Sequence, residues 1–298
     1  MAIARCLAGR LANTAISCVQ SRMSETTFKA SCATGSDWQS VARHCLQAIG
    51  TEPSRANLGF LYITDSLAPY LQMLLEEFRQ KTGVRDWVGT VGAGICCTGR
   101  EIYDEPAAAI MLATLPTDSY RLIPSGIKEL SDALQQQQSW IAGKNVHFGV
   151  VHGDPRNTHI AQIIASLSTE LDPGFLVGGL TSASEEHFMQ QIAGDIYEDG
   201  LSGVLMSAEV QVISGLTQGC TPLTNKHTIT RSEGHILAEL DGRPALDVFR
   251  EDIGETLAMD LSGVAGYIYA GLPVPGSDTG DYLVRNLIGI CLLYTSPS

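Results

Sequence analysis

Two stretches of this chain decide its fold: residues 58–65 read LGFLYITD, and residues 146–154 read VHFGVVHGD. Each is a continuous run of mostly apolar, β-prone residues that ends in an aspartate, and a helical pattern follows it. A strand that is covered on both faces has such a continuous run, whereas a half-exposed strand alternates apolar and polar residues. We therefore expect both stretches to be strands of a sheet that helices cover.

The residues after the two strands follow one order. Apolar residues recur at helical spacing over residues 67–81 and again over residues 157–170. A second strand, a glycine turn, a polar loop and a third strand then complete each copy. The chain is predicted to have an α/β fold, in which internally duplicated β-α-β-β units, residues 57–115 and 146–208, form a helix-covered sheet.

An aspartate stands between strand and helix in each copy, Asp65 in the first and Asp154 in the second. An aspartate at this position commonly accepts a hydrogen bond from a free backbone amide of the first helical turn. Pro155 agrees with this interpretation because a proline is tolerated where a helix begins. We predict that both aspartates cap the helices that follow them.

The pattern changes after the second copy. Residues 227–231 and 235–240 are short β-prone runs, and Pro244 opens a helical run to about residue 257. This order predicts an antiparallel β-meander and a helix that belong to a second, smaller layer or domain. Before the first copy, residues 37–49 read as one amphipathic helix.

Both ends of the chain are excluded from the predicted fold. Residues 1–22 contain three arginines and no acidic residue, which indicates either an organelle-targeting leader or a spurious upstream extension before Met23. The last eight residues, 291–298, read CLLYTSPS and resemble a translated sequencing adapter, although a genuine polar tail is the alternative. If they are an adapter artefact, the native chain continues past Ile290.

Composition excludes several classes of function. The chain has 298 residues, of which 44% are hydrophobic and 17% charged, as in a globular protein. Its net charge of −13 disfavours a nucleic-acid partner, and apolar runs such as residues 107–115 are too short to span a membrane. Eight scattered cysteines predict free thiols in a reducing, cytoplasmic compartment. We expect no cofactor and no metal site, because the seven histidines lack ligand spacing.

Several segments, in their order along the chain, resemble proteins of the FIST family. The junction between the N-terminal and C-terminal parts of that family is similar to GLTQGCTPL at 215–223, HTITR at 227–231 and ELDGRPAL at 239–246. Its two glycine turns are similar to VGTVGAG at 88–94 and FLVGGL at 175–180. A segment of its C-terminal part is similar to GLP at 271–273 and DYLVRNLI at 281–288.

The resemblance covers residues 23–290 and implies a domain organisation. It implies an N-terminal helix region at 23–55, a FIST N-type sensory domain at 56–240 and the start of a truncated FIST C-type domain at 241–290. The family resemblance also implies an intracellular signal-transduction module that binds a small ligand, such as an amino acid, and acts alone or through a separate partner such as a kinase.

Two other functions stay open. One is a hydrolase or transferase with Cys97 or Cys220 as its nucleophile, which requires an activated thiolate. The other is a structural docking module without a ligand. The sequence departs from the family pattern at Cys96 and Cys97, directly after the first glycine turn.

The glycine turns are the first candidates for a ligand site. Gly92 and Gly94 in the first copy, with Gly178 and Gly179 in the second, would let backbone amides approach a ligand closely. The alternative is tight packing of helix against strand, which requires glycine equally. A phosphate site is disfavoured because the turns lack the third glycine of a dinucleotide fingerprint and the lysine of a P-loop.

Five further residues are candidates. Arg100 and Glu101 could pair with the carboxylate and the amino group of an amino acid, or form an ordinary solvated pair. Gln218, Gly219 and Cys220 end a predicted strand and could enter a cleft, or form a β-bulge with a buried thiol.

His152 stands two residues before Asp154, and a histidine with a carboxylate is a common acid–base pair. Helix capping already accounts for Asp154, and His152 has no nucleophile assigned to it. Nothing in the sequence resembles a nucleophile elbow or a catalytic triad. We therefore predict no catalytic residue in this chain.

Overall fold

The computed structural model describes residues 2–6, 26–50, 55–124, 130–171, 174–184, 188–213, 220–223, 226–259, 261, 267–273 and 282–289. Residues 19–212 form a larger compact unit, and residues 1–18 with 213–298 form a smaller one. The predicted adapter segment and most of the predicted leader lie outside the described residues. The predicted domain boundaries at residues 56, 240 and 290 stay predictions.

A six-stranded sheet forms the first half of the larger unit, in the order β12-β11-β4-β3-β7-β2. Its strands are β2 (Thr27–Thr34), β3 (Leu58–Thr64), β4 (Asp86–Gly92), β7 (Ala107–Thr114), β11 (Gln191–Ala193) and β12 (Asp195–Tyr197). Its helices are α1 (Trp38–Ile49), the 3-10 helix η1 (Asp65–Tyr70) and α2 (Leu71–Thr82). The central strand β3 is parallel to β4 and antiparallel to β7.

A four-stranded sheet forms the second half, in the order β10-β9-β13-β8. Its strands are β8 (Tyr120–Ile123), β9 (Val146–Gly153), β10 (Phe175–Leu180) and β13 (Leu201–Ser207), and its helices are α3 (Leu130–Lys144) and α4 (Ile160–Glu170). The central strand β9 is parallel to β10 and antiparallel to β13. The order β10-β9-β13-β8 therefore matches the order β4-β3-β7-β2 in the first half.

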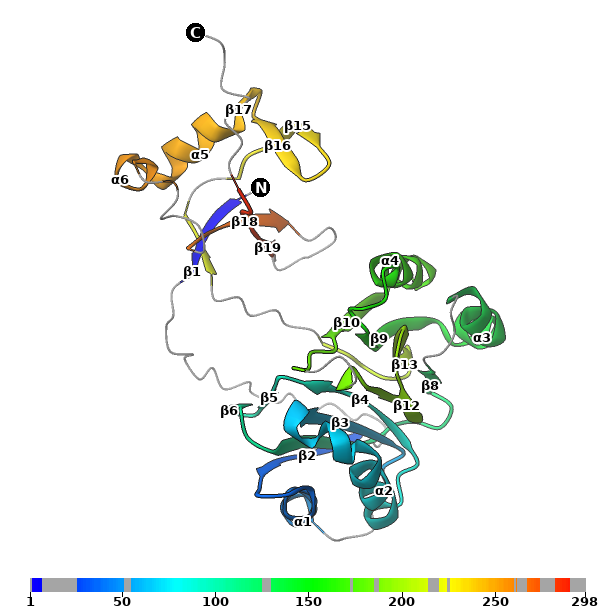
Figure 1. Cartoon of the computed structure of the whole chain (residues 1–298). Helices are drawn as coiled ribbons and strands as arrows, with labels where there is room; N and C mark the ends of the chain where they lie inside the picture. Colours follow the sequence, from blue (N-terminus) through cyan, green and yellow to red (C-terminus); the bar gives the residue numbers. More distant parts are fainter. Residues whose placement is uncertain are drawn as a thin grey trace. The chain divides into compact units, whose positions relative to one another are not determined.

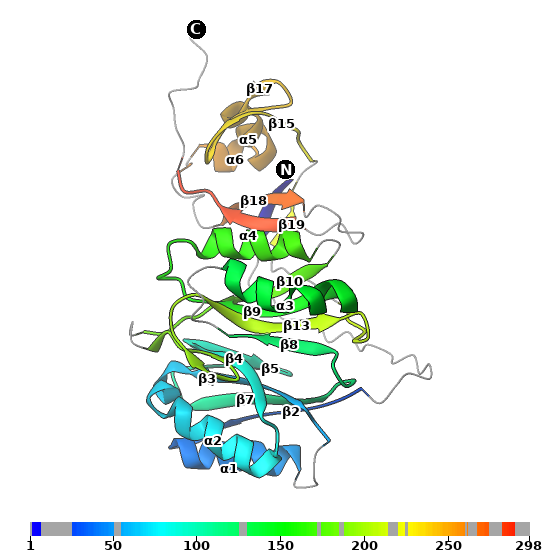
Figure 2. The same ribbon diagram turned by 90° about the vertical axis from the view of Figure 1, so that its right-hand side faces the viewer.

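The two sheets lie face to face, and each has its helices on the opposite face (Figures 1 and 2). The layers follow the order helices α1 and α2, six-stranded sheet, four-stranded sheet, helices α3 and α4. The predicted α/β class and helix-covered strands are confirmed. The sequence did not predict that each half makes a sheet of its own, because strand pairing across the chain leaves no local pattern.

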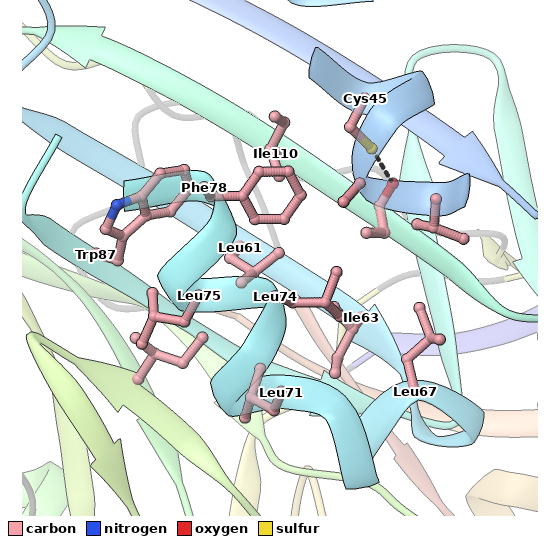
Figure 3. Packing of buried hydrophobic residues seen from close by; sticks show 14 of the residues in the cluster. Cys45, Leu61, Ile63, Leu67, Leu71, Leu74, Leu75, Phe78, Trp87 and Ile110 are labelled. Atoms are coloured by element: carbon pink, nitrogen blue, oxygen red, sulfur yellow. Dashed lines mark hydrogen bonds between the residues drawn. The ribbon is translucent and has the colours of Figure 1, made fainter. Parts of the chain in front are cut away.

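Helix α2 forms because its apolar residues recur every three or four positions, at Leu71, Leu74 and Phe78. All three are buried against the outer face of the six-stranded sheet, where the Phe78 ring stacks on Trp87 at a centroid distance of 5.7 Å (Figure 3). Burial of each such side chain contributes about 1.5–3 kcal/mol. The helix ends at Gly83, whose φ of 75° is the left-handed geometry that favours glycine.

The predicted caps at Asp65 and Asp154 are wrong. Helix α4 begins at Ile160, and no side chain caps it or η1. The Asp154 carboxylate instead accepts hydrogen bonds from the Arg156 guanidinium and the Asp199 amide. Asp154 therefore bonds to loop residues. Asp65 is the first residue of η1, but its carboxylate accepts hydrogen bonds from the amide and hydroxyl of Ser184 and not from an amide of the helix.

A short hairpin follows the first glycine turn. Strands β5 (Gly94–Cys97) and β6 (Arg100–Tyr103) pair with each other in a two-stranded sheet. Ile95 and Ile102 of this hairpin are buried against Ala107 and Ala109 of β7. The hairpin thereby covers part of the inner face of the six-stranded sheet.

The smaller unit contains the predicted meander, and the sheet orders are β15-β16-β17 and β14-β1-β18-β19. Its strands are β1 (Ala2–Cys6), β14 (Cys220–Pro222), β15 (Ile229–Glu233), β16 (Ile236–Leu240), β17 (Arg243–Pro244), β18 (Ile268–Pro273) and β19 (Tyr282–Asn286). The predicted helix after Pro244 is divided at Gly254 into α5 (Ala245–Ile253) and α6 (Glu255–Ala258). Across the described parts of both units, every helix is too short or too polar to cross a bilayer.

Candidate functional site

The inner faces of the two sheets change from apolar to polar along their strands. Leu58 and Phe60 of β3 lie in the apolar cluster between the sheets, and Tyr62 follows on the same face. In β9, Phe148 belongs to that cluster, and His152 follows on the same face. Both strands therefore bring a polar side chain to the interlayer near their carboxyl ends.

The neighbouring strands repeat this change. Val88 of β4 is in the apolar cluster, and Thr90 follows it two residues later. Strand β13 is antiparallel to β9, and its Ser202 lies opposite His152, before the buried Val204. We call the side chains at this end of the interlayer the polar margin: Tyr62, Thr90, His152, Thr181, Gln191 and Ser202.

Tyr62 and His152 join the two sheets at the centre of the polar margin. The Tyr62 hydroxyl lies 3.1 Å from His152 Nε2, and the two rings meet edge to face. Burial lowers the pKa of His152 to about 4 and raises the pKa of Tyr62 to about 12. Both side chains are therefore neutral near pH 7.

Two more hydrogen-bonded pairs connect the sheets. Ser202 Oγ donates to Gln191 Oε1 at 2.9 Å, and the hydroxyls of Thr90 and Thr181 are 2.7 Å apart. Thr90 also donates to the carbonyl oxygen of Gln190 at 3.0 Å. Because a hydroxyl has one proton to donate, Thr181 is the donor to Thr90.

Two nitrogen atoms of the polar margin have no hydrogen-bond partner within the described part of the chain: His152 Nδ1 and Gln191 Nε2. His152 is 2% exposed and Gln191 is fully buried. An unpaired buried polar atom costs about 1–3 kcal/mol, and in native proteins such atoms commonly bind an ordered water or a ligand. The polar margin therefore has free hydrogen-bonding capacity where it is buried.

The predicted glycines meet at this end of the interlayer. Gly92 ends β4, and the next amide, of Ala93, donates to Ser182 Oγ at 3.1 Å, just after β10. A Cβ on Gly94 would lie 2.3 Å from the Tyr103 ring, and one on Gly92 would lie 2.7 Å from the Gly94 carbonyl oxygen. Close packing therefore requires glycine at both positions.

Gly178 and Gly179 are adjacent in β10 but have different surroundings. Gly178 has a φ of 141°, and a Cβ there would lie 1.8 Å from the Val151 carbonyl oxygen. Gly179 pairs with His152 in the parallel ladder, and no atom lies within 4 Å of the place where its Cβ would be. Packing therefore requires Gly178, whereas Gly179 leaves open space beside His152.

The other predicted site residues belong to different parts of the chain. Arg100 and Glu101 are exposed neighbours in β6, so their side chains point to opposite faces of the hairpin. Gln218 and Gly219 lie outside the described residues. Cys220 belongs to β14 of the smaller unit. Arg100 and Glu101 share their hairpin with Gly94, which begins β5.

The structure describes the surroundings of both cysteines that the alternative function names. Cys220 is disulfide-bonded, which corrects the expectation of free thiols for this residue, and the strand register places Cys6 opposite it. Burial, and then a hydrogen bond to Cys97, raise the pKa of the Cys32 thiol to about 12. Cys97 is thus the hydrogen-bond partner of a thiol that stays protonated near neutral pH.

His152 and Asp154 do not act as a pair, because His152 bonds to Tyr62 and Asp154 bonds to Arg156. Within the described ranges, no three His, Cys, Asp or Glu side chains gather as metal ligands.

Sequence reasoning missed five of the six residues of the polar margin and considered His152 only as a catalytic base. The available signal was positional. Tyr62, Thr90 and His152 each stand one or two residues before the end of a strand, on the face that is apolar earlier in the same strand. Ligands of open α/β sheets commonly bind beyond the carboxyl ends of the strands.

The larger unit is thus an α/β domain of two facing sheets with a polar margin at one end of the interlayer. Residues 57–243, more than half of the chain, match the model of the FIST N domain, and the match includes every residue of the polar margin. The chain belongs to the FIST N domain family, which consists of sensory domains of signal transduction.

The chain is also similar to mycobacterial proteins. It is 28% identical to an uncharacterized protein of Mycobacterium tuberculosis over 214 residues, which cover 68% of this chain and 54% of that protein. It is 26% identical to an uncharacterized protein of Mycobacterium bovis over 253 residues, which cover 80% of this chain and 62% of that protein. The chain therefore matches only about half to three fifths of the length of these relatives.

Proposed function

We propose that this chain is a sensory module that binds a small ligand at the polar margin. The observation that carries the proposal is the pair of buried, unpaired nitrogens, His152 Nδ1 and Gln191 Nε2, on the inner faces of two facing sheets. A docking module without a ligand has no need of them, because buried unpaired atoms lower stability.

Three further observations support this site. It lies at the carboxyl ends of β3, β4, β9 and β10, where sheets of this class commonly bind ligands. Residue 179 is a glycine in open space, although its backbone geometry would accept a side chain. The family is one of sensory domains, for which an amino acid is one candidate ligand. A separate signalling partner, such as a kinase, and a cytoplasmic location complete the proposal.

A thermal-shift screen with a library of small metabolites tests the proposal. A ligand that binds only the folded protein raises the melting temperature. We expect a hit with the unmodified protein and a lost or much smaller shift with Gly179→Val, which fills the open space beside His152. Leu180→Val is the matched control, because it changes an exposed neighbour on the opposite face of β10 and should keep the shift.

Two results would overturn the proposal. One is a library without any hit. The other is a hit whose shift is equally large in Gly179→Val and in the unmodified protein, since the ligand would then bind elsewhere.

A further inference from the structure

The six side chains of the polar margin are all uncharged near pH 7. Three are hydroxyl-bearing serine or threonine residues, one is a glutamine, and burial keeps Tyr62 and His152 neutral. Burial is the cause of both pKa shifts.

Two carboxylates stand a few residues beyond polar-margin side chains along the chain, and both have partners of their own. Asp65 accepts hydrogen bonds from the amide and hydroxyl of Ser184, and Asp154 pairs with Arg156. A carboxylate or ammonium group of a ligand would find no counter-charge among the six side chains of the polar margin, and burial of an unpaired charge is strongly unfavourable. An amino acid, with one charge of each sign, is a poor match for this site.

The two unpaired nitrogens, Gln191 Nε2 and His152 Nδ1, determine which hydrogen-bonding groups a ligand must have. Gln191 Oε1 already accepts from Ser202, so the free Nε2 requires an acceptor. Whether His152 Nδ1 donates or accepts depends on the hydrogen bond between Nε2 and Tyr62. If the Tyr62 hydroxyl donates to Nε2, then Nδ1 has the proton and is a donor; if Nε2 donates to Tyr62, then Nδ1 is an acceptor. A carboxamide has both a carbonyl oxygen and an N–H group, so it pairs with Gln191 and with either form of His152.

We propose that the ligand of the polar margin is an uncharged molecule with a carboxamide-type group, held by Gln191 Nε2 and His152 Nδ1. The inference rests on the proposed function and narrows it from any small ligand to a neutral amide. It replaces the amino acid that the family resemblance implied.

Matched probe pairs test the charge of the ligand. Propionamide against propionate, and nicotinamide against nicotinate, differ mainly in charge, and glycine represents the zwitterion. The measurement is NMR of the protein with ¹⁵N-labelled glutamine and histidine, which follows the Gln191 side-chain amide and the His152 ring nitrogens. We expect an amide to shift both sets of signals saturably, at a concentration at least about tenfold lower than its carboxylate partner.

The variants separate the contributions of the two nitrogens. In Gln191→Leu the donor is lost while the side-chain volume is nearly kept, so the amide response at His152 should weaken about tenfold. If this variant does not fold, the comparison of probe pairs on the unmodified protein still decides the question.

Each outcome has a distinct meaning. Equal or stronger responses to propionate, nicotinate or glycine would overturn the neutral-amide inference and leave the binding site in place. No response to any probe, with the free nitrogens contacting water alone, would overturn the inference as well. A metabolite library that also gives no thermal shift would then overturn the proposed function.

Discussion

The two ends of the interlayer differ in how their polar groups are satisfied. At the end opposite the polar margin, the Tyr120 hydroxyl of β8 lies 2.6 Å from the Asn57 carbonyl oxygen and 2.9 Å from Asp86 Oδ2. The Asn57 side chain makes two hydrogen bonds to the backbone of Leu115, each of 3.0 Å. We call these residues, Asn57, Asp86, Leu115 and Tyr120, the closed margin.

The comparison of the two margins distinguishes polar side chains that stabilise the fold, at the closed margin, from those of the candidate ligand site, at the polar margin. Both margins join the same two sheets through polar side chains. At the closed margin, Tyr120 and the Asn57 side chain bond to the protein itself, and the neighbouring buried Ser119 Oγ is unpaired among the described residues. The polar margin leaves two side-chain nitrogens unpaired, His152 Nδ1 and Gln191 Nε2. The ligand site proposed above rests on these two buried nitrogens, because a buried polar atom without a partner calls for an explanation.

The largest expected effect distinguishes two adjacent glycines at this end of β10: Gly178, which is closely packed, and Gly179, which faces open space. Gly178→Ala should destabilise the protein by about 3 kcal/mol or more, because the new Cβ meets the Val151 carbonyl oxygen and the φ of 141° disfavours a side chain. Gly179→Ala should change stability by less than about 0.5 kcal/mol. Urea unfolding of both variants checks this, and equal losses would contradict the assignment.

The next effect is a pH dependence that the polar margin should show and the closed margin should not. The pKa of His152 is about 4 in the folded protein and 6.5 ordinarily, so the unfolded chain takes up the proton first as pH falls. Stability should be complete above pH 6.5 and fall by roughly 3 kcal/mol as pH decreases to about 4. In His152→Gln this loss of stability should be absent. The measurement is the free energy of unfolding of both proteins over this pH range. The same pH dependence in the variant and in the unmodified protein would refute the prediction.

A third effect compares one side chain from each margin. Asn57→Ala should cost about 2 kcal/mol, because it removes two hydrogen bonds and leaves the Leu115 backbone unpaired. Gln191→Met should cost less than about 1 kcal/mol, since the loss of the Ser202 bond is offset by removal of an unpaired buried nitrogen. Chemical denaturation of the two variants measures the difference, and a larger cost for Gln191→Met would reverse the comparison.

The smallest effect concerns a second histidine, in the smaller unit. The hydrogen bond that the His227 ring donates to the Asp241 carboxylate, together with the nearby Asp252 carboxylate, raises the pKa of His227 above 6.5. Its contribution is present below pH 6.5 and is lost as pH rises through the raised value, which is the opposite sign to His152. NMR titration of His227 and His152 in one sample checks both directions.

Much of the fold could be predicted from the sequence, because continuous apolar runs and helical spacing are local signals. They identified β3, β9 and α2, and also the helix α1, where Asp37 and Ser40 form a capping box. Strands of three or four residues, such as β11 and β12, are too short for a periodic signal. Helix α3 contains four consecutive glutamines, residues 135–138, and shows no clear apolar face in its sequence.

The candidate site was predicted only in part. The glycine turns drew attention to the end of the sheets where the polar margin lies, because strand ends can be located from sequence. Whether a glycine is packed or open depends on neighbours from other strands, as Gly178 and Gly179 show. Tyr62 was counted as one more β-prone residue, and its pairing with His152, 90 positions away, could not be known before the two sheets were seen to face each other.

Native mass spectrometry of the protein after incubation with a metabolite extract tests the central claim most directly. We expect one small adduct on the unmodified protein and on Tyr120→Phe, which alters only the closed margin, and no adduct on Gly179→Val. Retention of the adduct by Gly179→Val, or its loss from Tyr120→Phe alone, would contradict the assignment of the ligand site to the polar margin.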